Sequence, residues 1–366
     1  MNRRGSPHPL AAVSVWNLTW LLAHYGVSAG YVPRAAGMLL SSVLTAPLRL
    51  LDRATGWIPL RRARFDRPPV FIVGHWRSGT THLHNLMCRD EQFGFASMYQ
   101  SMTADYFVKP PAFLRGLMGG MIPNRRPMDD VKVALDEPQE EELGLMRTST
   151  VSFNHAYNFP LAARRVFDHC VLFEGAPRAE GQWKRAYRDF LRRLAISQEG
   201  RRLCLKNPPN TARLRQILDL FPDARFIHIY RNPYVVYDST LHLWKSLLPH
   251  WSLQKHDPAE LPEIVLDFYR RLMERYFADS PLIAPGRLSE VRFEELEARP
   301  LEELERIYGE LQLDGFTAAR RNIETYAQSL ADYRKNRYDY DPEKARRVRE
   351  RWGFTIDRWG YLPPGN

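Results

Sequence analysis

Residues 70–86, "VFIVGHWRSGTTHLHNL", begin as an apolar run, continue through small and polar residues, and return to apolar residues at helical spacing. The apolar run predicts a buried strand at 70–73. The residues that resume the apolar pattern, Leu83, Leu86 and Met87, predict a helix directly after the break. A strand, a tight loop and a helix in this order are typical of a loop that binds phosphate at a helix N-terminus.

The loop has the spacing of the pattern G-x-x-x-x-G-K-[ST], with Gly74 and Gly79 as its two glycines. Thr80 stands where the pattern requires lysine, and Arg77 lies two residues before the second glycine. Backbone N–H groups, hydroxyls and one fixed cation can still hold an anion. The stretch therefore predicts an anion-binding loop with Arg77 as its cation, in preference to a plain strand-to-helix turn.

A second region repeats the alternation of strands and helices. The segments "RLCLK" at 202–206 and "RFIHIY" at 225–230 predict strands, with a helix at about 210–220 between them and another from near Tyr234. This spacing predicts an α/β fold, a parallel sheet covered by helices, whose ligands bind at the carboxyl ends of the strands. The features at such ends are the loop at 74–81, Lys206 and Arg231. Further elements are expected as helices at about 260–278 and 300–312 and a strand at 287–293.

The end of the strand at 225–230 helps to distinguish classes of phosphate-binding protein. A kinase or other nucleoside triphosphatase should place an Mg²⁺-holding aspartate at such a strand end. The chain has Arg231 there, and Ser239 follows eight residues later on the predicted helix. A cation and a hydroxyl at this place predict a second phosphate site, in which the protein itself neutralises the charge.

These residues resemble the sulfotransferases that use 3′-phosphoadenosine 5′-phosphosulfate. In that family a Lys or Arg before Ser-Gly-Thr-Thr binds the 5′-phosphosulfate, and an Arg followed eight residues later by a Ser binds the 3′-phosphate. The matching residues are Arg77, Ser78, Gly79, Thr80 and Thr81 for the first site, and Arg231 and Ser239 for the second.

The likeness covers roughly residues 68–312. The loop "GHWRSGTT" and the acidic run at 138–142 are most similar to a bacterial branch that includes enzymes acting on lipid or quinone hydroxyls. The resemblance implies a three-layer α/β/α fold with a central parallel sheet, preceded here by a helical N-terminal extension. It implies 3′-phosphoadenosine 5′-phosphosulfate as donor, adenosine 3′,5′-bisphosphate as product, and no required metal.

The resemblance also suggests roles in the reaction. Arg77 and Lys206 would stabilise charge on the sulfuryl oxygens and the leaving phosphate. Many cytosolic members have a catalytic His where this chain has Pro208, so the base is expected elsewhere. Clustered carboxylates in "DEPQEEEL" are candidates, with Glu140 preferred, Glu142 second, and His82 third. The alternative is that this run is only a solvated acidic helix start.

The N-terminal region differs in composition from the rest of the chain. Residues 5–33 contain no Asp, Glu, Lys or Arg, and tryptophans and tyrosines lie among their apolar residues. Three interpretations are open: a helical extension lying on a membrane surface, a helical hairpin packed on the protein, and a membrane span. We predict a helical, membrane-associated extension at 1–66 and a catalytic domain at 67–366.

Charge and cysteine content restrict the partners. The formal net charge of +10 favours anionic partners, and an anionic membrane surface is among them. No nucleic-acid partner is expected, because the arginines are dispersed and no recognised module appears.

Cys88, Cys170 and Cys204 form no metal-ligand or disulfide pattern by spacing, so we expect no metal site and a reducing, cytoplasmic location.

The sequence therefore predicts a sulfotransferase that acts on an acceptor hydroxyl of a small molecule or lipid, with a lipophilic alcohol or quinone-type lipid preferred. The alternatives are a kinase or nucleoside triphosphatase, a carbohydrate sulfotransferase, and a non-catalytic sensor of nucleotides or anions. The sequence leaves the oligomeric state open.

Overall fold

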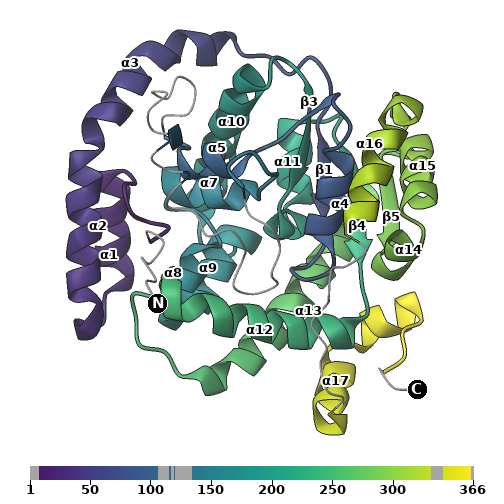
Figure 1. Cartoon of the computed structure of the whole chain (residues 1–366). Helices are drawn as coiled ribbons and strands as arrows, with labels where there is room; N and C mark the ends of the chain where they lie inside the picture. Colours follow the sequence, from purple (N-terminus) through teal and green to yellow (C-terminus); the bar gives the residue numbers. More distant parts are fainter. Residues whose placement is uncertain (1–7, 106–114, 117–118, 120–133, 331–340, 364–366) are drawn as a thin grey trace. The chain divides into compact units, whose positions relative to one another are not determined.

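The strands predicted from the sequence form one parallel sheet in the computed structural model, which describes residues 8–105, 115, 116, 119, 134–330 and 341–363 (Figure 1). The sheet has five strands in the order β2-β3-β1-β4-β5. Their bounds are β1 Val70–Val73, β2 Phe93–Gly94, β3 Arg202–Lys206, β4 Arg225–Tyr230 and β5 Leu288–Arg292. The predicted α/β class is confirmed, and only the two-residue strand β2 had no counterpart among the expected strands.

Burial explains why these segments become strands. All four residues of β1 are buried, which suits the central strand of a parallel sheet that is covered on both faces. Val70 and Ile72 belong to the hydrophobic core on one face. Phe71, which points to the opposite face, stacks on Phe226 of β4 with ring centroids 5.7 Å apart. The sheet thus has helices on both sides and forms the middle of three layers.

The chain divides into two compact units, and unit 2 contains the whole sheet. Unit 2 consists of Asp66–Phe95, Arg201–Trp244 and Asp257–Asn366. Its helices are α4 Thr80–Met87, η4 Pro208–Ala212, α11 Leu214–Leu220, η5 Pro258–Glu260, α13 Leu261–Asp279, η6 Ser280–Leu282, α14 Phe293–Ala298, α15 Pro300–Glu310, α16 Phe316–Ser329 and α17 Pro342–Trp359. Helix α12, Pro233–Trp251, begins in this unit.

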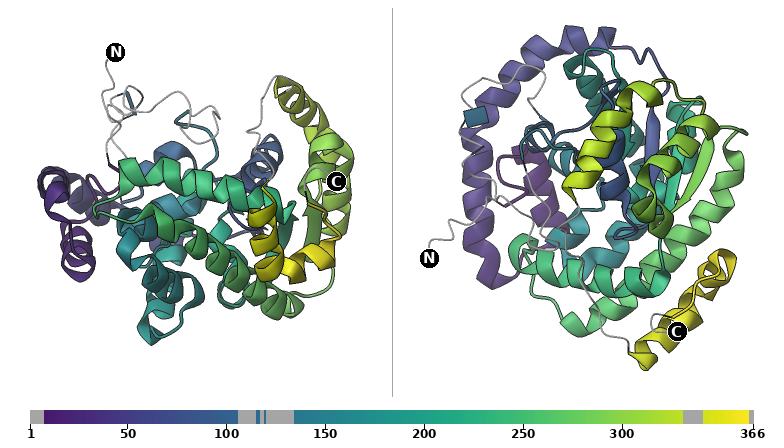
Figure 2. Two further views of the ribbon diagram at one scale, coloured as in Figure 1. Left: turned by 90° about the horizontal axis from the view of Figure 1, so that it is seen from below. Right: turned by 45° about the vertical axis from the view of Figure 1, so that its right-hand side comes forward.

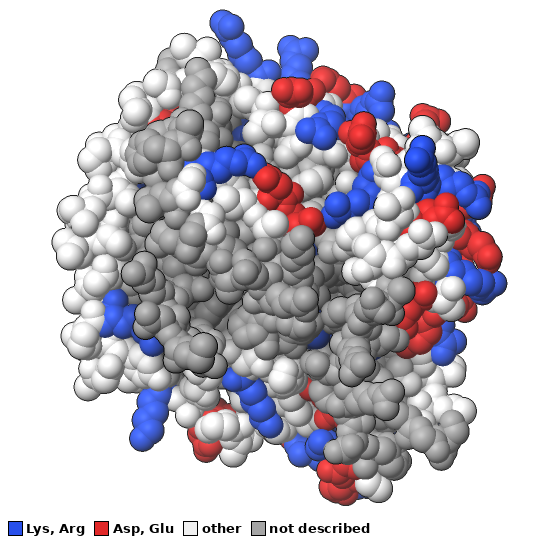
Figure 3. Space-filling model, viewed as in Figure 1, with Lys and Arg blue, Asp and Glu red and all other residues white. Residues whose placement is uncertain are grey.

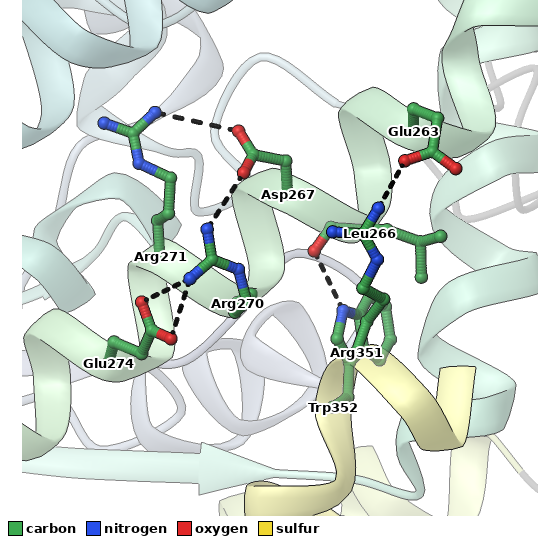
Figure 4. Close-up of polar contacts among 8 residues, drawn as sticks. All are labelled: Glu263, Leu266, Asp267, Arg270, Arg271, Glu274, Arg351 and Trp352. Carbon is green, nitrogen blue, oxygen red and sulfur yellow. Dashed lines mark hydrogen bonds and ion pairs between the residues drawn. The ribbon is translucent and has the colours of Figure 1, made fainter. Parts of the chain in front are cut away.

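Two helix pairs illustrate how unit 2 is held together. Helix α16 lies beside α4 (Figure 2), where the Asn85 amide donates to the Tyr326 hydroxyl over 3.0 Å. On the other side, the Trp352 indole of α17 donates to the Leu266 carbonyl of α13 over 2.9 Å (Figure 4). Figure 4 also shows Arg351 of α17 paired with Glu263 of α13. The C-terminal helix is therefore an integral part of this unit.

The described elements of unit 1 are helices, joined by loops and one isolated antiparallel bridge between Ser97 and Pro138. Unit 1 consists of Met1–Phe65, Ala96–Gly200 and Lys245–His256. Its helices are α1 Val15–Tyr25, η1 Ala29–Tyr31, α2 Val32–Leu44, α3 Ala46–Arg62, α5 Met98–Met102, α7 Glu141–Thr148, α8 His155–Asn158, η2 Pro160–Ala162, α9 Ala163–Phe167, η3 Asp168–Leu172 and α10 Pro177–Ser197. The predicted helical N-terminal extension is present as α1, α2 and α3.

Helix α1 is packed within unit 1. Leu18 and Leu21 are buried, and the Asn17 amide donates to the Thr148 carbonyl over 3.0 Å. These contacts support the interpretation of a helical hairpin packed on the protein for this part of the extension. Among the described residues, no single helix has the length and apolar character of a membrane span, whereas Ala29–Leu44 and Ala46–Gly56 meet both criteria as a pair bent by 42°.

The boundary between the two units at residues 65 and 66 lies next to the one expected from the sequence. Unit 1 nevertheless contains residues 96–200 as well as the N-terminal helices. The division into an extension at 1–66 and a catalytic domain at 67–366 therefore stays a prediction.

Candidate active site

The loop between β1 and α4 has a backbone that only particular residues adopt easily. Gly74 and Gly79 have φ values of +147° and +99°, in the region that favours glycine. Arg77 also has a positive φ, +69°, which is unfavourable for a residue with a long side chain. Strain of this kind is concentrated at ligand-binding sites. The loop therefore holds its arginine in one imposed orientation.

Both glycines are also needed because neighbouring groups press on the loop. A Cβ atom on Gly74 would lie 2.3 Å from the carbonyl oxygen of Ile229, and one on Gly79 would lie 2.2 Å from the Phe293 ring. The Gly74 N–H donates to the Thr211 hydroxyl over 2.7 Å. Any larger residue would push the loop away from β4 and the start of α14.

The two sequence motifs meet at the side chain of Arg77. Its Nε donates to the Ser239 Oγ over 2.9 Å, and Arg231 Nη1 donates to the Arg77 carbonyl over 3.3 Å. The Arg231 guanidinium lies over the Phe293 ring, 4.3 Å from its centroid. The loop and the Arg-Ser pair, which are about 150 residues apart in the sequence, therefore form one cationic site in unit 2.

Lys206 belongs to the same site. It ends β3 and is 1% exposed, and its Nζ lies 3.4 Å from the Thr81 Oγ1, to which it donates. A nearly buried ammonium is costly without anionic or polar partners. The lysine is thus directed toward the first turn of α4, where the N–H groups of the helix start are concentrated.

A buried polar network lies directly after Lys206. The side chains of Asn207 and Arg213 both donate to the Asn210 Oδ1, over 3.4 and 3.2 Å, and all three residues are buried. Together with Thr211, they fix the chain that follows β3. Sequence reasoning assigned no role to these residues, although the run "KNPPNT" of amides and a hydroxyl after a strand was the available signal.

Histidines border the site as well. His82 lies in the first turn of α4, with its ring 6.2 Å from that of Phe293, edge to face. His75 is fully enclosed, and burial lowers its pKa to about 3, so the ring is neutral at pH 7. A pocket opens at the end of β4, and its lining includes His75, Ser78, Tyr230, Arg231, Tyr269 and Trp359.

The predicted carboxylate bases lie in unit 1, whereas the cationic site lies in unit 2. Glu140 immediately precedes α7 and is half-buried. Glu142 is fully buried, and its Oε1 accepts from the Phe153 N–H at 2.6 Å and from the Ser152 hydroxyl at 2.8 Å. These bonds give Glu142 a structural task within unit 1, so Glu140 stays the preferred candidate. The assignment of either residue as base stays a prediction.

Comparisons with known proteins find sulfotransferases, both by sequence and by fold. The sequence profile described as the sulfotransferase family matches residues 68–318. Two relatives, omega-hydroxy-beta-dihydromenaquinone-9 sulfotransferases of Mycobacterium bovis and Mycobacterium tuberculosis, are each 34% identical over 294 residues, covering 80% of this chain and 75% of the relative.

Two solved structures share the fold. Sulfotransferase STF1 from Mycobacterium tuberculosis matches with a TM-score of 0.68 and 20% identity, over 92% of this chain and 90% of that chain. Sulfotransferase STF9 from Mycobacterium avium matches with a TM-score of 0.66 and 17% identity, over 97% of this chain and 98% of that chain. At these identities the likeness concerns the fold.

Proposed function

The chain belongs to the sulfotransferase family, and from this premise we propose that it transfers a sulfuryl group from 3′-phosphoadenosine 5′-phosphosulfate to the hydroxyl of a lipophilic, quinone-type acceptor. The observation that carries the proposal is the convergence of Arg77, Arg231 and Ser239 within hydrogen-bonding distance. Such a site can hold two anionic groups of a single ligand, because Arg77 can pair with one group and Arg231 with the other.

The residues divide between the two ends of the donor. The loop at 74–81 and the start of α4 suit the 5′-phosphosulfate, since backbone N–H groups and hydroxyls converge there. Arg231 and Ser239 suit the 3′-phosphate, to which they can supply a charge-assisted and a neutral hydrogen bond. Because the protein supplies its own cations at both ends, the reaction we propose requires no divalent metal.

In the proposed reaction, the acceptor oxygen forms a bond to sulfur as the bond from sulfur to the bridging phosphate oxygen breaks. Negative charge grows on that bridging oxygen, and Lys206 and Arg77 stabilise it. The acceptor proton passes to a base, for which Glu140 is the first candidate, before Glu142 and His82. The products are the sulfate ester and adenosine 3′,5′-bisphosphate.

The acceptor class rests on the relatives, whose names specify a hydroxylated menaquinone. It agrees with an apolar face on the N-terminal helices of unit 1, where large side chains are exposed. This apolar face of α2–α3 consists of Val32, Leu40, Val43, Leu44, Leu50, Leu51 and Ile58. Figure 3 shows few charged side chains over α1 and α2, at the left of the view.

Charge around the apolar face favours an anionic bilayer. Asp52 is the single acidic residue at positions 1–65, and it is buried in an ion pair with Arg193. The exposed charges of α2 and α3 are all basic: Arg34, Arg53, Arg61 and Arg62. Basic residues near anionic headgroups contribute about 1 kcal/mol each. We therefore propose peripheral association of the protein with the cytoplasmic face of a membrane.

Turnover in the presence of EDTA tests the proposed function. The full-length protein is incubated with 3′-phosphoadenosine 5′-phosphosulfate and a hydroxylated menaquinone in detergent micelles, with a set of carbohydrates in parallel. Mass spectrometry should detect the sulfate ester of the quinone together with adenosine 3′,5′-bisphosphate. Sulfation of carbohydrates alone would retain the reaction but exclude the acceptor class. A parallel incubation with ATP and Mg²⁺ and without EDTA tests the kinase alternative: phosphorylation there, with no sulfation in EDTA, would replace the proposal by a kinase.

A further inference from the structure

Two of the three cysteines and one histidine come together in the core of unit 2. One potential ligand atom from each of His84, Cys88 and Cys204 lies within 4.8 Å of the other two. His84 and Cys88 lie one helical turn apart at the end of α4, and Cys204 lies in the middle of β3. The spacing of the cysteines does not indicate this cluster, because it depends on the packing of α4 against β3.

The hydrogen bonds of His84 orient its ring. The ring is fully buried, and Nε2 lies 3.1 Å from the Cys204 carbonyl oxygen, so Nε2 carries the hydrogen and donates. The other nitrogen, Nδ1, is buried and has no hydrogen-bond partner among the described residues. Histidines that bind metals usually donate their second ring N–H to a carbonyl or carboxylate in this way. The lone pair of Nδ1 is therefore available to a ligand.

Two sulfurs and one imidazole nitrogen are soft and borderline ligands, which favour Zn²⁺ over Mg²⁺ or Ca²⁺. Lys206 ends the strand that contains Cys204, and its charge acts on His84. The positive charge of Lys206 repels a second cation bound in the core. This repulsion is offset if both thiols ionise, because the two thiolates neutralise the charge of the ion. A Zn²⁺ ion with two thiolates and a neutral imidazole has no net charge, so its burial is compatible with this environment.

We propose that His84, Cys88 and Cys204 form a structural zinc site that joins the end of α4 to β3. Binding releases the two thiol protons and forms one bond from Zn²⁺ to each of the three side chains, and a water molecule takes the fourth tetrahedral position. The site takes no part in sulfuryl transfer. The site would affect the positions of active-site residues, because α4 begins directly after Gly79 of the anion-binding loop and β3 ends at Lys206. The ion would hold these two parts of the active site in register.

Cobalt substitution and metal analysis test the site on the full-length protein. Wild type, Cys88→Ser and Cys170→Ser are compared after purification with a reductant that does not bind metals. Cys170 is the matched control, because its thiol is buried in the π-helical turn η3 of unit 1. Wild type and Cys170→Ser should bind one Zn²⁺ per chain. With Co²⁺, both should show the near-ultraviolet charge-transfer band of a thiolate ligand.

Cys88→Ser should weaken zinc binding at least about tenfold and lose most of the band intensity. Because Cys88 is only half-buried, this variant should keep the wild-type circular dichroism spectrum. Zinc should also raise the melting temperature of wild type and of Cys170→Ser, and not that of Cys88→Ser. Wild type that retains no zinc, gives no charge-transfer band and melts at the same temperature with and without zinc would overturn the proposal.

Discussion

The active site of unit 2 buries polar groups, whereas the N-terminal helices of unit 1 expose apolar ones. Lys206 is 1% exposed, while Leu44 is 70% exposed. Each arrangement costs free energy in water, because a buried ammonium loses hydration and an exposed leucine leaves apolar surface in water. An anion at the first region and a bilayer at the second would each reduce that cost. Both regions are therefore suited to a partner other than water, an anion in the first case and a bilayer in the second.

The largest expected effect concerns the buried lysine. Lys206→Ala should lower kcat by about 10²- to 10³-fold, because the ammonium stabilises charge that develops as the sulfur–oxygen bond breaks. Affinity for adenosine 3′,5′-bisphosphate, measured by calorimetry, should change by only a few fold. Lys255→Ala, an exposed lysine of unit 1, is the control and should match wild type. If Lys206→Ala keeps its kcat, the lysine contributes only to the structure.

The second prediction concerns Glu140 of unit 1, the first candidate for the base. Glu140→Gln should lower kcat by about 10²-fold or more, because the amide cannot accept the acceptor proton. The melting temperature should stay the same, since Glu140 is half-buried at a helix start. An active Glu140→Gln beside an inactive Glu142→Gln or His82→Ala would transfer the role of base to that residue.

The third prediction concerns the exposed leucines. Leu44→Ser should weaken flotation of the protein with anionic liposomes by roughly tenfold, since a leucine that enters an apolar phase contributes about 1.5 kcal/mol or more. The fold should not change, because the side chain is exposed. Leu282→Ser in unit 2, also exposed, is the control and should float like wild type. Equal flotation of all three proteins would exclude the apolar face of α2–α3 as the bilayer contact.

The smallest effect concerns stability against pH. Burial lowers the pKa of His75 from its ordinary value of 6.5 to about 3. As pH falls below 6.5, the unfolded chain binds a proton that the folded chain excludes, so the free energy of unfolding decreases. Between pH 6.5 and 5.5 this histidine should account for a loss of about 1 kcal/mol.

Urea unfolding at both pH values checks this expectation. His75→Gln should show a shallower decline in stability from pH 6.5 to 5.5 than wild type, whatever its stability at pH 7. The remaining slope should come from other buried histidines, such as His8 and His155, whose pKa values burial lowers to about 4. An unchanged slope in His75→Gln would mean that His75 titrates normally in the folded protein.

The elements around the candidate site and the meeting of its two motifs could largely be predicted, because their signals are short in sequence. The strands at 202–206 and 225–230 have the predicted bounds, since continuous apolar runs end at a charged residue or a proline. The loop at 74–79 could be predicted from the local spacing of its glycines and polar residues alone. The structure places Arg77, Arg231 and Ser239 together, as the motifs implied.

The remaining features depend on long-range packing. Gly74 bonds to Thr211 across 137 positions, and His84 meets Cys204 across 120. Neither contact can be predicted from the spacing of residues along the sequence. Hydropathy also could not separate the packed residues of α1 from the exposed leucines of α2 and α3. All three helices contain large apolar side chains, and only tertiary contacts decide which of them are covered.

Calorimetric titration of Arg231→Ala in EDTA, with two ligands, shows whether Arg231 binds the 3′-phosphate of the donor. If the site holds both ends of the donor, this variant should lose about 1.5 to 3 kcal/mol of affinity for adenosine 3′,5′-bisphosphate and keep its affinity for adenosine 5′-phosphate. Ser239→Ala should show the same selectivity with a smaller loss, and Arg270→Ala, a surface arginine of α13, should match wild type. Equal losses for both ligands, or none for either, would contradict the account.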